Sequence, residues 1–246
     1  MQVRIFSDPF ELAQAAASLA VSSIQSLLAL QGTVRLVAAT GTSQIAFLEN
    51  LTRDRSIDWS RVEVFHLDEY IGLDIEHPAS FARYISDRLI QPAGISRFYL
   101  LNGARDPREV IADANVKISS RAVDIAFIGI GENGHLAFND PPADFQVEDP
   151  YIAVNLDTRC RRQQVNEGWF TTLDEVPQQA ISMSVRQILK SREIIAVAPD
   201  QRKSRAVKDS IEGPINPSVP ASILQQHPKL ILFLDTNSAS LLEKSI

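Results

Sequence analysis

A pair of neighbouring carboxylates gives this sequence its first chemical signal. Asp68 and Glu69 directly follow Val62–Leu67, a run rich in β-branched and aromatic residues that predicts a buried strand. Burial disfavours the ionised form of a carboxyl group and so raises its pKa toward the range that a general base needs. In the structural alternative, Asp68 caps a turn and Glu69 lies in water. His66 and Asp68 could also suggest a metal site, but two ligands with no third candidate nearby do not make one.

A glycine-rich segment carries the second signal, a histidine. Three of the ten glycines fall in Gly129–Gly134, which follows an apolar run and precedes His135. The spacing matches G-x-G-x-x-G, but a dinucleotide fingerprint must open a long helix, and Pro141-Pro142 would end one within two turns. The glycines instead favour close approach of the backbone to a small ligand, beside a histidine that Asn133 and Asp140 could orient as a proton shuttle. A histidine simply bonded inside a tight loop is the alternative.

Polar and basic residues in other loops could hold an anion. Thr40-Gly41-Thr42-Ser43 follows an apolar run and opens a helical pattern, so its backbone N–H groups and hydroxyls suit a phosphate. Taken alone, an ordinary capped turn is the better interpretation of so short a motif, which lacks the lysine of a Walker sequence. Arg159 and Lys203 add two cations to an acidic chain and, taken singly, would be surface charges. Together, these loops indicate a phosphate-bearing ligand.

The elements that must position these residues alternate in type along the chain. Helical patterns separate short runs, most of which are apolar on both faces, as in a covered parallel sheet. The clearest helix begins with Asp8 as N-cap and Pro9 at its first position, and ends near Gly32. Two further helices are predicted over Ile45–Leu51 and Ala79–Leu89. The runs that predict strands are Val3–Phe6, Val34–Ala38, Val62–Leu67, Phe98–Leu101, Asp124–Ile130, Ile152–Leu156, Glu193–Ala198 and Leu230–Leu234.

This alternation predicts an α/β fold with a doubly wound, mostly parallel, Rossmann-like sheet and helices on both faces. We expect one domain over residues 1–246, because no linker or repeat divides the chain, and we expect the irregular segment 141–150 to be a lid or an insertion. Ligands of such sheets bind beyond the carboxyl ends of the strands, where the loops described above lie.

Composition narrows the partners of the protein. A net charge of −6 opposes broad attraction to nucleic acid or anionic lipid. The N-terminus has no signal-peptide pattern, and no stretch reaches the 18 or more apolar residues of a spanning helix. The single cysteine, Cys160, rules out an internal disulfide. We therefore expect a cytoplasmic globular protein, without nucleic-acid or membrane partners.

Taken together, the motifs resemble the glucosamine-6-phosphate deaminases, of the superfamily that also contains the 6-phosphogluconolactonases. The resemblance extends from about Val34 to Asp235. Lactonases share instead an Asp-Glu-Arg block and a Gly-His-Thr-Ala-Ser-Leu-Phe-Pro block, and this chain has neither. The matching segments are Thr40-Gly41-Thr42, Leu67–Leu73 with His77-Pro78, Gly129–His135 leading to Phe138–Pro141, Asp157-Thr158-Arg159, Lys203 and Glu212-Gly213.

The resemblance implies conversion of an aldose 2-amine phosphate to a ketose phosphate with release of ammonia, without a metal or an organic cofactor. It implies that Asp68 moves a proton between C2 and C1, and that His135, supported by Asp140, assists ring opening. The residues expected to hold the sugar phosphate are Thr40, Gly41, Thr42, Ser43, Arg159 and Lys203, and those expected elsewhere in the pocket are Glu69, Tyr70, Gly134 and Asn139.

Three features depart from the family pattern. Asn133 stands where Asp is frequent and cannot take a proton, and Asp140 stands where Glu is common and is one methylene shorter. The segment 141–150 carries no Arg or Lys, whereas regulated bacterial members bind an activating sugar phosphate with basic residues in this region. The sequence therefore predicts that this allosteric site is absent.

Two other functions stay open. One is a related enzyme acting on galactosamine 6-phosphate or on a 6-phosphogluconolactone, because a single hydrogen bond can decide the configuration that is accepted. The other is a non-catalytic sugar-phosphate sensor, which only Asn133 supports. A homo-oligomer is compatible with the sequence, since relatives range from monomers to hexamers.

Overall fold

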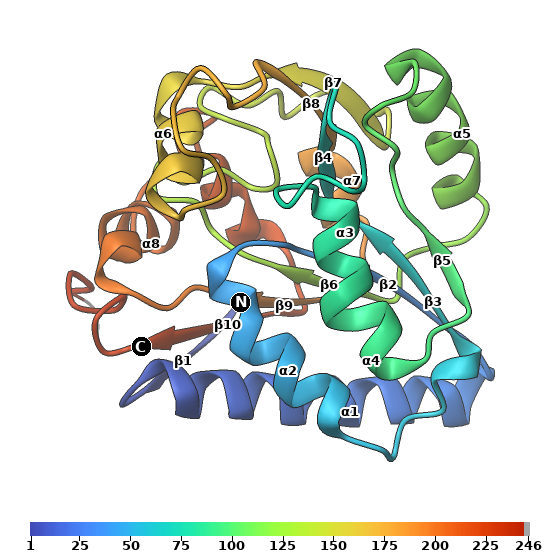
Figure 1. The fold of residues 1–246 in the computed structure, drawn as a ribbon. Helices are drawn as coiled ribbons and strands as arrows, with labels where there is room; N and C mark the ends of the chain where they lie inside the picture. Colours follow the sequence, from blue (N-terminus) through green and yellow to red (C-terminus); the bar gives the residue numbers. More distant parts are fainter. Residues whose placement is uncertain (244–246) are drawn as a thin grey trace.

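A seven-stranded sheet forms the centre of the protein in the computed structural model, which describes residues 1–243 (Figure 1). Every neighbouring pair of strands in it runs parallel, which confirms the predicted mostly parallel α/β sheet. In spatial order the strands are β1 (Gln2–Phe6), β10 (Leu230–Asp235), β9 (Glu193–Val197), β6 (Ile125–Ile128), β2 (Val34–Ala38), β3 (Val62–His66) and β5 (Arg97–Tyr99).

The central strand β2 shows why such runs form this sheet. All five of its residues are buried, and its β-branched side chains pack on both faces, as a strand covered by two helical layers requires. Arg35 is its one charged residue. The guanidinium forms an ion pair with Glu63 on β3 at 2.7 Å and donates to the Ile118 and Arg121 carbonyls at 3.0 and 2.7 Å. The buried charge is thereby fully partnered.

Helices cover both faces of this sheet, as predicted. One face packs against α1 (Pro9–Gln31), α2 (Ile45–Arg53) and the continuous helical stretch of α3 (Phe81–Ile85), η3 (Ser86–Ile90) and α4 (Gln91–Ala93) (Figure 1). The other face packs against α5 (Pro107–Ser119), α7 (Val185–Leu189), α8 (Ser204–Ile211) and the 3-10 turns of η5 (Pro220–Gln226).

The long helix α1 begins and ends where the sequence predicts. The Asp8 carboxylate accepts hydrogen bonds from the Phe10 and Glu11 amides, and Gly32 ends the helix at a φ of 83°. By length and composition α1 is apolar enough to cross a membrane, which corrects the expectation that no segment passes such a test. Its fully buried residues, Leu12, Ala16, Ala20 and Ile24, pack on the sheet, so its apolar character is that of a core helix.

A second, three-stranded antiparallel sheet was not predicted. Its order is β4 (Asp68–Tyr70), β8 (Gln179–Met183) and β7 (Tyr151–Asn155). β7 corresponds to the predicted run at Ile152, but it alternates between buried and exposed residues and belongs to this sheet. The helix α6 (Thr158–Asn166) follows β7, and both are drawn above the main sheet in Figure 1.

The direction of winding reverses between β2 and β6. From β2 the chain continues outward through β3 and β5, and it then returns to β6 and continues the other way through β9 and β10. Loops after β2 and β6 therefore diverge and leave a crevice at the carboxyl ends of the strands, the place where open α/β sheets bind ligands.

Candidate active site

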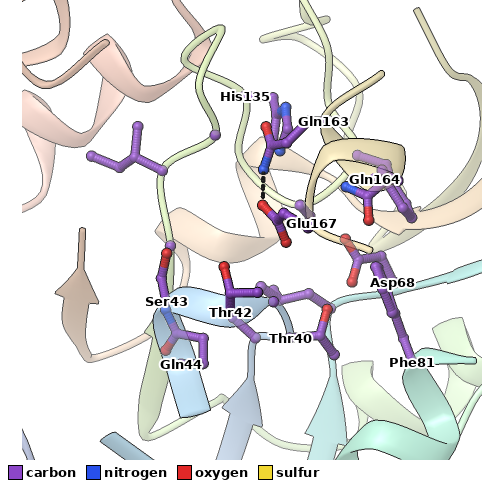
Figure 2. Close-up of a pocket in the computed structure, with 18 of the residues that line it drawn as sticks. Thr40, Thr42, Ser43, Gln44, Asp68, Phe81, His135, Gln163, Gln164 and Glu167 are labelled. Atoms are coloured by element: carbon purple, nitrogen blue, oxygen red, sulfur yellow. Dashed lines mark hydrogen bonds between the residues drawn. The ribbon is translucent and has the colours of Figure 1, made fainter. Parts of the chain in front are cut away.

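A pocket occupies this crevice. Its walls come from the loop after β2, the start of β4, the glycine-rich loop after β6, the short 3-10 helix η4 (Gln201–Lys203) and α6 (Figure 2). The elements are distant in sequence, so the fold itself assembles the site. The predicted site residues that line the pocket are Thr40, Gly41, Thr42, Ser43, Asp68, His135 and Lys203.

Asp68 reaches the pocket from the first position of β4. Asp68 is 5% exposed, and its carboxylate has no hydrogen-bond or ion-pair partner among residues 1–243. Burial, together with the negative charge of Glu69, raises the pKa of Asp68 well above its ordinary value. An unpartnered carboxyl group with a raised pKa at a pocket wall can accept and return a proton.

His135 lies directly over Gly131, which explains one glycine of the loop. A Cβ atom at Gly131 would lie 2.3 Å from Cε1 of the imidazole, so any other residue would displace the ring. The Nδ1 atom of His135 is 3.3 Å from an Asp140 oxygen, while Nδ1 forms no well-aligned hydrogen bond in the part of the chain that the structure describes. The carboxylate can stabilise an imidazolium at this distance and orient the ring toward the pocket.

Asp140 and Asn133 hold the histidine from behind rather than lining the pocket. Asn133 donates to Asp140 at 3.1 Å, and its side-chain oxygen accepts from the His135 amide at 3.1 Å. The Asp157 amide donates to the other Asp140 oxygen at 3.0 Å. Burial raises the pKa of Asp140, but contacts with His135, Asp157 and Asn133 outweigh it, so the pKa is lowered overall. Asp140 therefore keeps its charge beside the imidazole.

The strand β8 contacts both Asp68 and the loop that carries His135. Ser182 on β8 pairs with Asp68 in the small sheet, and its hydroxyl accepts from the Phe138 amide at 3.0 Å. Asn139 donates to the Met183 carbonyl at 2.8 Å and to the Leu136 carbonyl at 2.7 Å. One strand thus fixes the positions of both Asp68 and the loop that carries His135.

His135, Asp140 and Cys160 bring one potential metal-ligand atom each to within 4.8 Å of one another. Both oxygens of Asp140 already accept hydrogen bonds, from Asn133 and from Asp157. Burial and the Asp140 charge raise the pKa of the Cys160 thiol well above its usual value, and a protonated thiol is a poor metal ligand. The chemistry of this donor set fits a proton network better than a metal centre.

The opposite end of the pocket is suited to an anion. Gly41 has a φ of 100°, which favours glycine, and its carbonyl accepts from the Tyr84 hydroxyl at 2.9 Å, so the loop is anchored before η1 (Thr42–Gln44) and α2 begin. Lys203 is 4% exposed, and within the described residues its ammonium group has no hydrogen bond or ion pair. Burial lowers its pKa, although the charges of Glu167 and Glu132 oppose the shift. A buried, unpartnered cation beside free backbone N–H groups can bind a phosphate.

Glu69 and Tyr70 have structural positions, which corrects their expected place in the pocket. Glu69 accepts from the Ser80 hydroxyl at 2.7 Å and from the Ala82 amide at 2.8 Å, so its carboxylate caps the start of α3. Tyr70 is completely buried, and its ring packs against Phe81, Phe138 and Phe170. The two neighbouring carboxylates therefore differ in position: Asp68 faces the pocket, whereas Glu69 stabilises the start of α3.

Three other expected contacts also lie away from the pocket wall. Arg159 is exposed and lines an adjoining surface groove, because α6 turns it outward. Gly134 adopts a φ of 84°, which favours glycine, so it determines the path of the loop. Asn139 donates its hydrogen bonds to main-chain carbonyls, including that of Met183 on β8. None of residues 141–150, all described, lines the pocket, and the Ala143 amide instead donates to the Pro217 carbonyl at 3.0 Å.

Several pocket residues were missed by the sequence analysis. Gln44 directly follows the predicted phosphate loop and could have been found from that position alone. Gln163, Gln164 and Glu167 line the wall contributed by α6 and the turn after it (Figure 2). The buried side of α6 is polar, so no apolar periodicity marks which of its residues face inward.

Comparison with known proteins decides the family. The profile of the family described as glucosamine-6-phosphate isomerases/6-phosphogluconolactonase matches residues 7–232. The chain belongs to this family. This chain is 32% identical to the glucosamine-6-phosphate deaminase of Lactobacillus delbrueckii subsp. bulgaricus, and the alignment covers 99% of this chain and 100% of that protein. It is 35% identical to the deaminase of Streptococcus pyogenes serotype M1 over 87% of its length and 89% of that protein.

Solved structures of relatives share the fold. A structure described as a monomeric glucosamine-6-phosphate deaminase superposes with a TM-score of 0.91 at 29% identity, covering 98% of this family member and 100% of that chain. A 6-phosphogluconolactonase from Shewanella baltica gives a TM-score of 0.80 at 22% identity, covering 96% and 97% of the two chains. The latter similarity shows the fold alone.

Proposed function

We propose that this family member is an enzyme that converts glucosamine 6-phosphate and water to fructose 6-phosphate and ammonia. The observation that carries the proposal is one pocket with two buried groups, the Asp68 carboxyl and the Lys203 ammonium, neither of which has a hydrogen bond or an ion pair within residues 1–243. Deaminases similar over nearly the full length support it. A pure sensor would need Lys203 and the phosphate loop, but it would have no use for Asp68 with a raised pKa.

The geometry suggests how the reaction proceeds. Lys203 and the loop Thr40–Ser43 bind the 6-phosphate and so fix the sugar. His135, oriented by Asp140, transfers a proton from the C1 hydroxyl to the ring oxygen, and the C1–O5 bond breaks. The Asp68 carboxylate then takes the proton from C2 while a proton moves from the amino nitrogen to O1, and Asp68 returns its proton to C1, which leaves an imine at C2 and a hydroxyl group at C1. Water adds to this imine, the C2–N bond breaks, and ammonia leaves with the ketose phosphate.

A product assay tests this proposal. Purified protein is supplied separately with glucosamine 6-phosphate, galactosamine 6-phosphate and 6-phosphogluconolactone, and ammonia, fructose 6-phosphate and the lactone are measured. Equal amounts of ammonia and fructose 6-phosphate from the first substrate are expected. Lactone hydrolysis without ammonia release, or binding without turnover of any substrate, would contradict the proposal.

The proposal extends to organisation and location. The main and small sheets share one hydrophobic core, in which Val37 and Phe65 of one sheet cluster with Ile181 and Met183 of the other, and this supports a single domain. The solved deaminase similar to it is described as monomeric, so we favour a monomer over a homo-oligomer. A cytoplasmic location is proposed because its single cysteine is a free, buried thiol.

A further inference from the structure

A second carboxylate, Glu167, lies in the pocket and has no role in the mechanism above. Figure 2 shows it between Gln163, on the His135 side, and the loop residues Thr40 and Thr42. One oxygen accepts from the Gln163 amide at 2.7 Å and the other from the Trp169 indole N–H at 3.1 Å. Both donors are neutral, so they orient the carboxylate without cancelling its charge.

Lys203 attracts the charge of Glu167 through space, since this charge opposes the lowering of the Lys203 pKa, but the two groups are not paired within residues 1–243. These two residues line the same pocket, yet they form no ion pair with each other in the described chain. A negative charge in a pocket that binds phosphate repels the ligand, unless the ligand brings a positive charge of its own. The pocket therefore matches a ligand with an anion at one end and a cation at the other.

We infer that Glu167 binds the 2-ammonium group of the substrate and so selects amino-sugar phosphates over neutral sugar phosphates. The inference rests on the proposed function, because glucosamine 6-phosphate carries its cation at C2 and its phosphate at C6. Lys203 binds the phosphate, and Glu167 binds the ammonium. Asp68 cannot serve as this fixed anion, since it must be free to take the C2 proton.

Glu167 also selects by repulsion. A sugar phosphate with a hydroxyl group or a lactone carbonyl near this site leaves the carboxylate desolvated and unpaired, which weakens binding of the wrong ligand. Gln163 and Trp169 act as positioning residues, because they fix the direction in which the carboxylate points. The selection resides on the α6 wall, apart from the proton-transfer groups.

Two alditol phosphates test the inference without turnover. 2-Amino-2-deoxyglucitol 6-phosphate and glucitol 6-phosphate differ at C2, and neither can form a ring or isomerise. Calorimetry gives the Kd of each for the wild type, for Glu167→Gln and for a control, Glu132→Gln. The control removes a carboxylate that also acts on Lys203 but lies outside the pocket wall, where it pairs with Arg202 at 3.1 Å.

We expect the wild type to prefer the amino ligand by about tenfold or more, the gain of one charge-assisted hydrogen bond. Glu167→Gln should bring the ratio of the two Kd values close to one, with glucitol 6-phosphate bound as tightly as before or more tightly. Glu132→Gln should keep the wild-type ratio. An unchanged ratio in Glu167→Gln, or no preference in the wild type, would overturn the inference alone. If neither ligand binds the wild type, both the inference and the proposed function are contradicted.

Discussion

The pocket wall that comes from the sheet and the wall that comes from α6 hold their polar residues in different ways. Asp68 and the phosphate loop follow strands whose residues are buried in two apolar layers. On α6 the buried side chains are themselves polar and include Gln163 and Gln164. The groups proposed to transfer a proton or to bind the phosphate are thus placed by the apolar core, whereas those proposed to select the amino group lie on an element with polar packing.

The largest expected effect lies on the sheet wall, in the substitution Asp68→Asn. Asparagine keeps the size of the side chain but cannot take the C2 proton, so kcat should fall by about 10³-fold. Binding of glucitol 6-phosphate should change by less than about threefold, because ligand binding is assigned to other residues. A fructose 6-phosphate assay and calorimetry measure the two quantities. A kcat near that of the wild type would remove Asp68 from the mechanism.

The same substitution should stabilise the fold in a pH-dependent way. Because burial raises the pKa of Asp68, the folded protein favours the protonated carboxyl group, and this stability is lost as the pH rises through the raised pKa. Asp68→Asn should therefore raise the Tm by about 3 °C at about pH 8 and by less at about pH 4. Thermal melts at both pH values measure this, and a gain of equal size at both would contradict the raised pKa.

A smaller loss of turnover is expected from Asp140→Asn, which acts through His135. The amide cannot stabilise an imidazolium as the Asp140 carboxylate does at 3.3 Å, so kcat should fall by about 10²-fold. KM should change by less than about threefold, because Asp140 does not line the pocket. An unchanged kcat with lower thermal stability would mean that Asp140 only supports the loop.

Lys203→Met, on the sheet wall, should weaken phosphate binding while it increases the stability of the fold. Loss of the cation should weaken binding of glucitol 6-phosphate by about 30-fold. Methionine also relieves the desolvation of a buried, unpartnered ammonium group, so the Tm should rise by about 2 °C or more. Calorimetry and thermal melts test both parts. Unchanged binding would place the phosphate elsewhere.

The smallest effect is expected on the α6 wall, from Trp169→Phe. This removes one of the two hydrogen bonds to Glu167 and keeps an aromatic ring in place. The preference for the amino alditol phosphate should fall about threefold, with kcat within about twofold of the wild type. A large loss of kcat would show that residues of the α6 wall take part in the reaction itself, and this would contradict the proposed difference between the two walls.

Much of the main sheet was predictable from the sequence, because its central strands are mostly apolar runs buried on both faces. β2 was predicted to the residue at Val34–Ala38, and the other strands of this sheet within a few residues. The small sheet was not. β4 is three residues long and reads Asp-Glu-Tyr, so it gives no strand signal, and its place depends on pairing with β8, which is distant in sequence.

The candidate site was predictable where residues follow such strands. Asp68, His135 and the loop at Thr40 could be assigned because carboxyl ends of parallel strands converge. The role of Glu69 could not, since its hydrogen bonds come from Ser80 and Ala82, after a turn without a clear pattern. Nor could the direction of Arg159, because the polar residues of α6 do not reveal its buried face.

The shared anchoring on β8 has a consequence for how relatives of this protein can diverge. Ser182 and Met183 contact both Asp68 and the loop that carries His135, so the distance between Asp68 and this loop is set by strand pairing and main-chain contacts. Exchanging side chains along α6 leaves that distance intact. Changes on α6 and on the turn after it, where Glu167 and Trp169 lie, can therefore alter the proposed substrate preference without moving Asp68 or His135.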